Sequence, residues 1–408
     1  MLTIEPARRR RMGSGRIGVA LAGGGPLGAF YELGTLHALA EALGRDLTDF
    51  DVYVGVSSGS LLAAGLANGF DTTSLGRTFI YDEGTLLPFS PELFLRPAIG
   101  EYGRRLARWP AALASALRQY ARNPAAGGWQ PVLGAVAKLA PTTVFDNRQL
   151  EGYLHEAFSS PGHTDDFRRL RARLYIVATR LSTGESVVFG APGYDHVAIS
   201  RAAVASAALP GLYPAVEIDG RHYVDGALLR TMHASLALEA SCELVICINP
   251  LVPYDSSGTR GRGYSNLADE GLAAILAQTF RAFIHSRMQV GMTSYRARFP
   301  QADTLLFEPE RRDEMLFHTN LFAYSGRGQL VDHAYQQTRR DLLAQADALA
   351  PVLARHGLRL DTGVLRQNRR SFASAVRERA EHSRGACRRL DRALLRLEHL
   401  VGLEDRGS

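Results

Sequence analysis

The sequence predicts an α/β fold, and three observations support that prediction. An apolar run over 17–21 is followed by a glycine-rich turn and by a helical pattern over 29–43. A second apolar run, over 51–56, leads in the same way into a small-residue helical pattern over 60–68. The 408 residues are 46% apolar and 22% charged, which indicates a globular protein with one large, elaborated domain or with two domains.

The first of the two turns contains Gly23, Gly24, Gly25 and Gly28. A glycine backbone adopts a positive φ without strain and lets other groups approach it closely. An oxyanion hole needs N–H donors aimed at a developing negative charge. The amides of this turn are therefore candidate oxyanion donors.

The second turn, Gly55-Val56-Ser57-Ser58-Gly59, is a G-x-S-x-G motif between a predicted strand and a predicted helix. A nucleophile elbow has this context, because its glycines let strand and helix approach and leave the serine Oγ exposed. We therefore predict that Ser57 is a nucleophile and that Gly55 and Gly59 shape its elbow.

Two other interpretations of these turns are less well supported. Gly23, Gly25 and Gly28 match the G-x-G-x-x-G pattern of dinucleotide-binding folds, but the acidic residue of the next strand, Asp51, lies at its wrong end. An α/β-hydrolase with a Ser-Asp-His triad would have several strands before its nucleophile. Its histidine would be one of five that have no supporting local pattern: His222, His233, His285, His318 and His333.

Residues 71–141 interrupt the alternation of strands and helices and are predicted to form an inserted helical cap. Within the cap, 104–122 places apolar residues at helical spacing and arginines on the opposite face. This pattern fits a membrane-surface helix, but we favour a cap helix that packs on the core with a solvated basic face. The apolar positions are Leu106, Trp109, Leu113, Leu117 and Tyr120, and the arginines are Arg104, Arg108, Arg118 and Arg122.

Regular structure resumes after the cap. In chain order we predict a helix over 145–158, a hairpin of strands over 174–178 and 187–189, a buried helix over 197–208, a second hairpin over 216–218 and 222–224, and a strand over 243–248. The second hairpin delivers Asp225-Gly226-Ala227 into a new helix.

Three motifs together resemble the patatin-like phospholipases in their order and spacing. They are Gly23-Gly24-Gly25-x-x-Gly28, then Gly55-Val56-Ser57-Ser58-Gly59 one helix later, and then Asp225-Gly226-Ala227 after the second hairpin. The similarity spans about 16–250 and includes 205–214 with its two prolines. It implies a three-layer α/β/α fold with a mainly parallel central sheet, and hydrolysis of lipid acyl esters of the phospholipase A or lysophospholipase type.

Carried over, the resemblance implies Ser57 as nucleophile, Asp225 as base and the amides of the Gly23–Gly28 turn as oxyanion hole, without metal, cofactor or catalytic histidine. An aspartate with a pKa near ~3.9 is a weak base, so Asp225 must be partly desolvated and hydrogen-bonded to the serine. The chain departs from the family at Leu27, where Arg or Lys often precedes the last glycine of the turn. A positive charge near the site is therefore absent from the turn.

The chain is divided into four parts. We predict a flexible basic arm over 1–14, a catalytic core with its inserted cap over 15–250, a helical completion of the core over 251–360, and a basic helical extension over 361–408. Beyond 250 we expect a helix over 265–296, a short strand over 303–307 and helices from about 324. The arginine-rich stretch 366–400 indicates a partner helix, a membrane surface, or, as we favour, a solvated helix docked on the core.

Charge and cysteine content restrict the partners and the location. The net charge is +6, but few aromatic residues are interleaved with the basic ones and no recognised module appears, so we expect no nucleic-acid partner. Cys242, Cys247 and Cys387 form no disulfide framework and indicate a reduced, cytoplasmic protein, with peripheral contact at the inner membrane surface as a further hypothesis. Arg8 to Arg11 imitate a signal peptide, but cleavage after it would damage the glycine turn.

Two functions from different classes follow. The first is serine-dependent hydrolysis of a lipid or lysophospholipid ester through an acyl-enzyme. The second is a peripheral membrane or granule-surface binding protein that keeps the hydrolase fold with little activity, and it rests on the basic amphipathic stretches 104–122 and 366–400.

Overall fold

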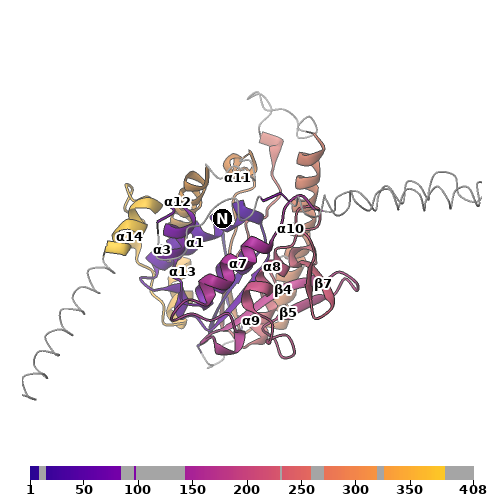
Figure 1. Cartoon of the computed structure of the whole chain (residues 1–408). Helices are drawn as coiled ribbons and strands as arrows, with labels where there is room; N and C mark the ends of the chain where they lie inside the picture. Colours follow the sequence, from indigo (N-terminus) through magenta and orange to yellow (C-terminus); the bar gives the residue numbers. More distant parts are fainter. Residues whose placement is uncertain are drawn as a thin grey trace, which may run out of the picture.

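The computed structural model describes residues 1–8, 15–83, 96–97, 143–229, 232–258, 271–318 and 326–381. Within them, one nine-stranded sheet lies between two layers of helices (Figure 1). The α/β class and the three-layer arrangement predicted from the sequence are confirmed. Most of the predicted cap, including 104–122, lies outside the described residues.

The sheet has the strand order β1-β9-β8-β2-β3-β4-β7-β6, and β5 pairs with β4 off this path. The five strands from β9 to β4 run parallel to one another, whereas antiparallel pairs close both edges. The strands are β1 (Leu2–Glu5), β2 (Ile17–Leu21), β3 (Val52–Val56), β4 (Arg173–Arg180), β5 (Ser186–Phe189), β6 (Val216–Ile218), β7 (Arg221–Asp225), β8 (Leu244–Ile248) and β9 (Asp303–Phe307).

One prediction about the start of the chain is wrong. Residues 1–14 were expected to be a flexible basic arm, but Leu2–Glu5 forms edge strand β1, which pairs antiparallel with β9. Leu2 is buried in the core, so the sheet gains an apolar contact as well as the ladder hydrogen bonds. The partner strand lies about three hundred residues away in the sequence, and a local pattern therefore gives no signal for it.

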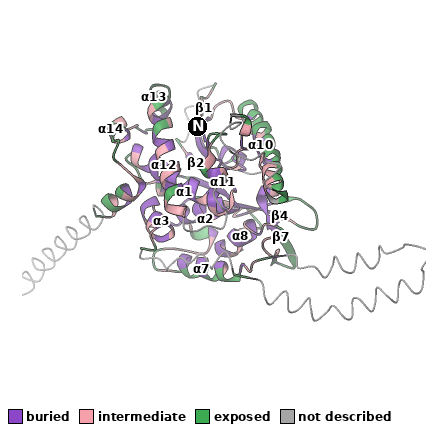
Figure 2. Ribbon diagram, turned by 90° about the horizontal axis from the view of Figure 1, so that it is seen from above, coloured by how far each residue is buried: buried purple, intermediate pink, exposed green. Residues whose placement is uncertain are grey.

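Alternate residues of the central strands feed two separate cores. On β2, Ile17, Val19 and Leu21 belong to one core, whereas Ala20 belongs to the other. Figure 2 shows α1, α2 and α8 largely buried, whereas α10 keeps an exposed outer face. The first face carries α1 (Gly25–Ala42), α2 (Ser58–Ala67), α3 (Thr72–Phe79), α7 (Arg148–Phe158), α8 (Ile199–Ser206), α12 (Arg327–Ala344) and α13 (Ala346–Arg355), and the second carries α9 (Ser235–Glu239) and α10 (Leu272–Arg298).

The parallel strands bring the predicted motifs to one edge of the sheet. The carboxyl end of β2 leads into the glycine turn, that of β3 leads into Ser57, and that of β8 leads into Pro250. In β7, Asp225 pairs with Ala178 near the carboxyl end of β4. Ligands of open α/β sheets bind outside the carboxyl ends of the strands, so this edge is where a site is expected.

Two predicted helices differ from those in the structure. The new helix expected after Asp225 is only a short 3₁₀ helix, Gly226–Leu228, because the Asp225 side chain caps the amide of Ala227 and closes a tight turn. The helix expected over 265–296 is α10, which begins at Leu272; 259–270 lies outside the described residues.

The described part of the C-terminal extension packs on the core. It contains α14 (Thr362–Leu365) and a helical stretch over 372–381, in which Phe372 and Val376 are buried. Arg370 forms an ion pair with Glu41 of α1. These residues support docking on the core for the first part of 366–400, whereas 382–400 lies outside the described residues. Among the described helices, none is both long and apolar enough to cross a membrane.

Candidate active site

Ser57 sits on a strained turn between β3 and α2. Its backbone has φ 52° and ψ −128°, in a region that L-residues with a side chain rarely adopt. The turn requires glycines at both flanking positions, because neither position has room for a side chain. A Cβ on Gly55 would lie 2.5 Å from Ser60 Cα, and one on Gly59 would lie 2.5 Å from the Ala22 carbonyl oxygen. The nucleophile elbow predicted from the motif is thus present in the backbone.

Two serine side chains hold the Ser57 backbone in place. The Ser57 amide donates a hydrogen bond to Ser206 Oγ at 2.8 Å, and Ser206 Oγ donates in turn to the Val177 carbonyl at 2.6 Å. From the other side, Ser60 Oγ donates to the Ser57 carbonyl at 2.5 Å. These buried bonds satisfy both backbone groups of the strained residue, which leaves its side chain to act.

Asp225 is fixed at the end of β7 by its own backbone and by its carboxylate. Its amide donates to the Ala208 carbonyl at 3.0 Å, and its carbonyl accepts from Thr179 Oγ1 at 3.0 Å. The carboxylate oxygen Oδ1 accepts from the Ala227 amide at 2.8 Å. Gly226 is required between them, since a Cβ there would lie 2.2 Å from the Val177 carbonyl oxygen.

The second carboxylate oxygen of Asp225 meets the nucleophile. Ser57 Oγ donates a hydrogen bond to Asp225 Oδ2 at 2.6 Å, although the residues are 168 positions apart in the sequence. Both are buried, with relative exposures of 7% for Ser57 and 2% for Asp225. Burial raises the pKa of Asp225 from 3.8 to about 6, and the hydrogen bonds from Ser57 and Ala227 oppose that rise. The aspartate is therefore a stronger base than an exposed one.

The glycine turn lies directly against the nucleophile. A Cβ on Gly23 would lie 2.9 Å from Ser57 Cβ, so only a glycine lets the turn approach so closely. The amides of Gly23 and Gly25 have no acceptor among the described residues, whereas the Gly24 amide donates to Ser58 Oγ at 3.1 Å. The Gly28 amide donates to the Gly24 carbonyl at 3.0 Å as part of α1. The Gly28 amide, predicted as an oxyanion donor, is thus already used within α1.

No histidine hydrogen-bonds to Ser57 or Asp225 in the part of the chain that the structure describes. His333 Nε2 lies 2.7 Å from Asp313 Oδ2, and His285 Nε2 lies 2.9 Å from an Arg311 nitrogen. His222 is exposed on β7. The geometry brings together a Ser–Asp pair and gives no support to a Ser-Asp-His triad.

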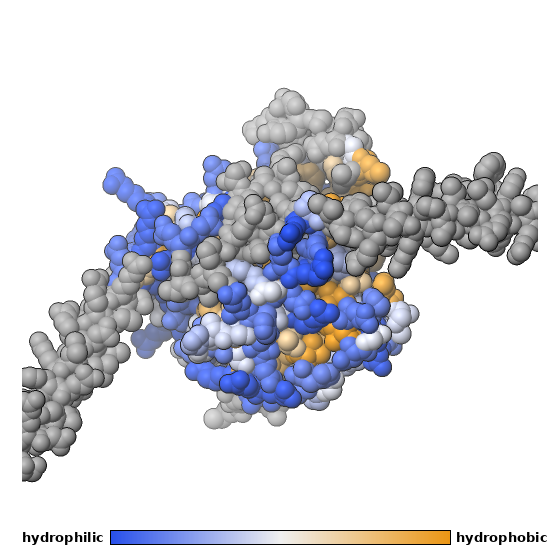
Figure 3. Space-filling view, in the orientation of Figure 1, coloured by the Kyte–Doolittle hydropathy of each residue, from blue (hydrophilic) through white to orange (hydrophobic). Residues whose placement is uncertain are grey.

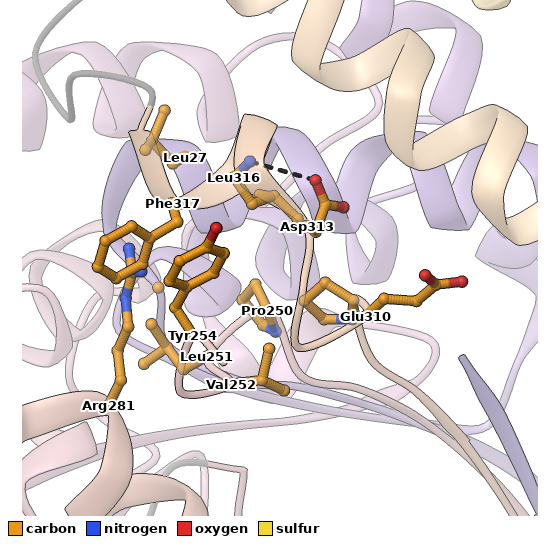
Figure 4. Close-up of a pocket in the computed structure, with 13 residues that line it drawn as sticks. Leu27, Pro250, Leu251, Val252, Tyr254, Arg281, Glu310, Asp313, Leu316 and Phe317 are labelled. Carbon is orange, nitrogen blue, oxygen red and sulfur yellow. Dashed lines mark hydrogen bonds between the residues drawn. The ribbon is translucent and has the colours of Figure 1, made fainter. Parts of the chain in front are cut away.

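A pocket opens beside the glycine turn (Figure 4). Gly24, Leu27 and Gly28 form one wall. The others are formed by residues of the segment 250–254 after β8, by Arg281 of α10 and by residues of the segment 309–317 after β9. Gly24 and Gly28 both lie against Pro250, because a Cβ on either would come within 3.0 Å of the proline ring. Ser57 and Asp225 do not line this pocket, so the turn separates it from the dyad.

Sequence reasoning missed the residues that support the dyad. Ser206, Ser60 and Thr179 hold the two reacting residues through their hydroxyl groups, and Ser58 accepts the Gly24 amide. The one available signal was a serine that follows the small, apolar run 202–205 of α8. The other three look like ordinary serine and threonine residues, because their partners lie on different elements.

The chain is similar to known proteins, as a family model and solved structures show. A family model described as patatin-like phospholipase matches residues 19–238, more than half of the chain, and includes both Ser57 and Asp225. The solved structure of VipD from Legionella pneumophila is 14% identical, with a TM-score of 0.35, and the alignment covers 82% of this chain and 70% of VipD. ExoU in its complex with SpcU from Pseudomonas aeruginosa is 16% identical, with a TM-score of 0.27 and coverages of 86% and 66%. No curated protein sequence matches the chain.

The matched range contains the glycine turn, the serine elbow and the Asp225 hairpin on one sheet. The chain belongs to the patatin-like phospholipase family, whose activity is hydrolysis of lipid acyl esters.

Proposed function

We propose that this protein hydrolyses acyl esters of phospholipids or lysophospholipids through an acyl-enzyme on Ser57, with Asp225 as general base. The observation that carries the proposal is the buried 2.6 Å hydrogen bond from Ser57 Oγ to Asp225 Oδ2. A serine hydroxyl is a poor nucleophile on its own and needs a base at its proton. Asp225 is the group placed to take that proton.

Acylation follows from this arrangement. Ser57 Oγ attacks the ester carbonyl carbon as its proton passes to Asp225 Oδ2, and the carbonyl oxygen becomes an oxyanion. When the tetrahedral intermediate collapses, the bond to the leaving alcohol breaks and Asp225 returns the proton to that alcohol. The raised pKa of Asp225, about 6, suits both steps, because a group that accepts and then donates a proton works best when its pKa lies near the working pH.

The glycine turn supplies the oxyanion donors in this proposal. Gly23 lies against Ser57, and its amide and that of Gly25 are not used by other described residues. Backbone donors fixed before the reaction stabilise a developing oxyanion without reorganisation. The Gly24 amide would join them only by leaving Ser58 Oγ.

Deacylation reuses the same groups. A water molecule takes the place of the leaving alcohol, loses a proton to Asp225 and attacks the acyl carbon. The second tetrahedral intermediate then releases the fatty acid, and Ser57 Oγ regains its proton from Asp225. The dyad ends in its starting state.

The described part of the molecule also has an exposed apolar patch that could contact lipid, at the start of α10. Leu272, Ile275 and Leu276, at the start of α10, are exposed by 71%, 40% and 58%. Figure 3 shows hydrophobic residues at the upper right, where the start of α10 lies in Figure 1. Clustered exposed apolar residues are typical of a surface that contacts other apolar material. Membrane contact near this site is thus part of the proposal.

A lipid-panel assay tests the proposed function. Wild type, Ser57→Ala and Asp225→Asn are compared on phospholipids, lysophospholipids and neutral glycerides, with release of fatty acid as the readout. We expect the wild type to release fatty acid and both variants to lose this activity while they remain folded by circular dichroism. Binding to liposomes without any Ser57-dependent release of fatty acid would instead support the binding-protein alternative.

A further inference from the structure

The pocket beside the glycine turn has one cationic side chain in its lining, Arg281 of α10. Leu27, which also lines the pocket, is apolar, so the turn itself brings no positive charge to it. The guanidinium lies over the Phe317 ring, with 4.9 Å from its central carbon to the ring centroid. Figure 4 shows the Arg281 side chain reaching from α10 to the aromatic rings of Phe317 and Tyr254.

Arg281 has no carboxylate or hydrogen-bond acceptor among the described residues. Other arginines of the fold are paired: Arg370 with Glu41, and Arg355 with Asp303. A guanidinium carries five N–H donors, and stacking on an aromatic ring leaves those at its edge free. Partial burial without an acceptor therefore leaves unused donors in the pocket.

The aromatic ring on which Arg281 stacks is itself held in place. One turn earlier on α10, Gln278 Nε2 donates to the Tyr254 carbonyl at 2.8 Å, and Gln278 Oε1 accepts from the Tyr254 amide at 3.1 Å. The Tyr254 and Phe317 rings stack with their centroids 4.4 Å apart and an interplanar angle of 17°. The side chain is held before any ligand arrives, which reduces the entropy lost on binding.

The two carboxylates that line the pocket do not neutralise this charge. Asp313 Oδ2 lies 2.7 Å from His333 Nε2, and its other oxygen accepts from the Leu316 amide at 3.4 Å. Glu310 is exposed, and in Figure 4 its side chain points away from Arg281. The part of the pocket at Arg281 is therefore open to an anion.

We propose that Arg281 binds the phosphodiester of the substrate head group while the ester lies at Ser57. The proposal rests on the proposed function above and deepens it, because it names the residue that distinguishes phosphate-bearing lipids from neutral esters. Arginine matches phosphate oxygens with two parallel N–H donors, and such charge-assisted bonds are stronger than neutral ones.

The glycine turn links the two ends of such a substrate. Gly24 lines the pocket, and the preceding residue, Gly23, lies against Ser57. A head group in the pocket and an ester at the nucleophile are thus separated by the width of one backbone turn. The proposal therefore requires the phosphate and the nearer ester of a phospholipid, which are only a few bonds apart, to lie on the two sides of this turn.

Paired substrates test this assignment. Arg281→Gln and the control Arg287→Gln, on the same helix, are assayed on a lysophospholipid and on the monoacylglycerol with the same acyl chain. We expect Arg281→Gln to lower kcat/KM for the lysophospholipid by about 10- to 100-fold, mainly through KM, and to change the monoacylglycerol by less than about twofold. Arg281→Lys should restore part of the loss, and Arg287→Gln should alter neither substrate.

An equal loss on both substrates, or no loss on the lysophospholipid, overturns the role of Arg281. A wild type that hydrolyses neutral esters through Ser57 but not lysophospholipids overturns it too and leaves the dyad standing. Hydrolysis that survives Ser57→Ala instead overturns the proposed function.

A binding measurement examines Arg281 independently of catalysis. Calorimetry on the Ser57→Ala protein compares dodecylphosphocholine below its critical micelle concentration, inorganic phosphate and the neutral detergent dodecyl maltoside. We expect dodecylphosphocholine to bind about tenfold or more weakly after Arg281→Gln, and dodecyl maltoside to be unaffected. Binding of inorganic phosphate that is as tight as that of dodecylphosphocholine would assign the site to free phosphate and contradict a lipid head-group site. Binding of dodecylphosphocholine that is unchanged by Arg281→Gln contradicts the assignment outright.

Discussion

The two sides of the glycine turn differ in how completely their polar groups are satisfied. On the Ser57 side, the backbone of the nucleophile and both carboxylate oxygens of Asp225 have hydrogen-bond partners inside the fold. On the pocket side, Arg281 has a ring to stack on but no acceptor among the described residues. The fold thus satisfies the nucleophile backbone and the base in advance, whereas the groups that would meet the substrate, the Gly23 and Gly25 amides and the Arg281 guanidinium, have no acceptor among the described residues.

The largest expected effect is loss of the nucleophile. Ser57→Ala should lower kcat for every ester by about 10⁴- to 10⁶-fold, because covalent catalysis is lost on the Ser57 side of the turn for any head group. Rates on lysophospholipid, monoacylglycerol and an aryl ester, measured with the same enzyme stock, check this. A variant that lost one substrate class alone would show that the two sides of the turn are not separate in function.

Loss of the base should be nearly as severe but should leave a more stable protein. Asp225→Asn is expected to lower kcat by about 10⁴-fold on all substrates, because the amide does not take the serine proton. In the folded protein the pKa of Asp225 is raised from 3.8 to about 6, so the fold stabilises the neutral acid better than the carboxylate. The contribution of Asp225 to the free energy of unfolding is therefore fully present below about pH 4 and is lost as the pH rises through 6.

Asp225→Asn does not ionise at this position, so its free energy of unfolding does not fall as the pH rises. It should be more stable than wild type by roughly 3 kcal/mol at pH 8, and the difference should vanish near pH 4. Urea unfolding at both pH values measures this. Lower stability of the variant at pH 8 would show that the buried carboxylate stabilises the fold, contrary to this account.

The pH profile gives a smaller effect on the same side. Asp225 must be ionised to accept a proton, so kcat/KM for a neutral ester should be flat above about pH 6 and fall about tenfold per pH unit below it. A neutral ester is the right substrate, since it does not titrate and does not use Arg281. A midpoint near 4 would mean that Asp225 is not desolvated in the free enzyme.

The smallest effect concerns the shape of the Asp225 turn. Gly226→Ala should destabilise the protein by about 1–3 kcal/mol, because its Cβ would meet the Val177 carbonyl oxygen at 2.2 Å. The matched control is Gly152→Ala in α7, where a Cβ meets nothing within 4 Å and helix propensity predicts a gain of about 0.5–1 kcal/mol. Similar melting temperatures for the two variants would argue that the turn tolerates a side chain.

Sequence alone predicted what local patterns encode. The bounds of β2 and β9 were predicted without error, and the Ser57 elbow and the Asp225 hairpin were placed correctly, because apolar runs and glycine turns are local signals. Strand β1 was missed, since its pairing partner is distant in the sequence.

Two parts of the site depend on contacts that a local pattern does not encode. The Gly28 amide matched a motif, but the helix that begins at Gly25 uses that amide within α1. Arg281 was not predicted at all, because on α10 it reads as one of several arginines on a polar face. Its distinguishing feature is the stacked pair of Tyr254 and Phe317, which meet only in three dimensions.

The most direct measurement of the central claim is to trap the acyl-enzyme. Wild type is mixed with an aryl ester, quenched in acid within the first turnovers and digested, and the acylated peptide is identified by mass spectrometry. We expect one acyl group per chain, on Ser57, and none on Ser57→Ala or Asp225→Asn. An acyl group on another residue, or turnover of the ester by Ser57→Ala, would contradict it.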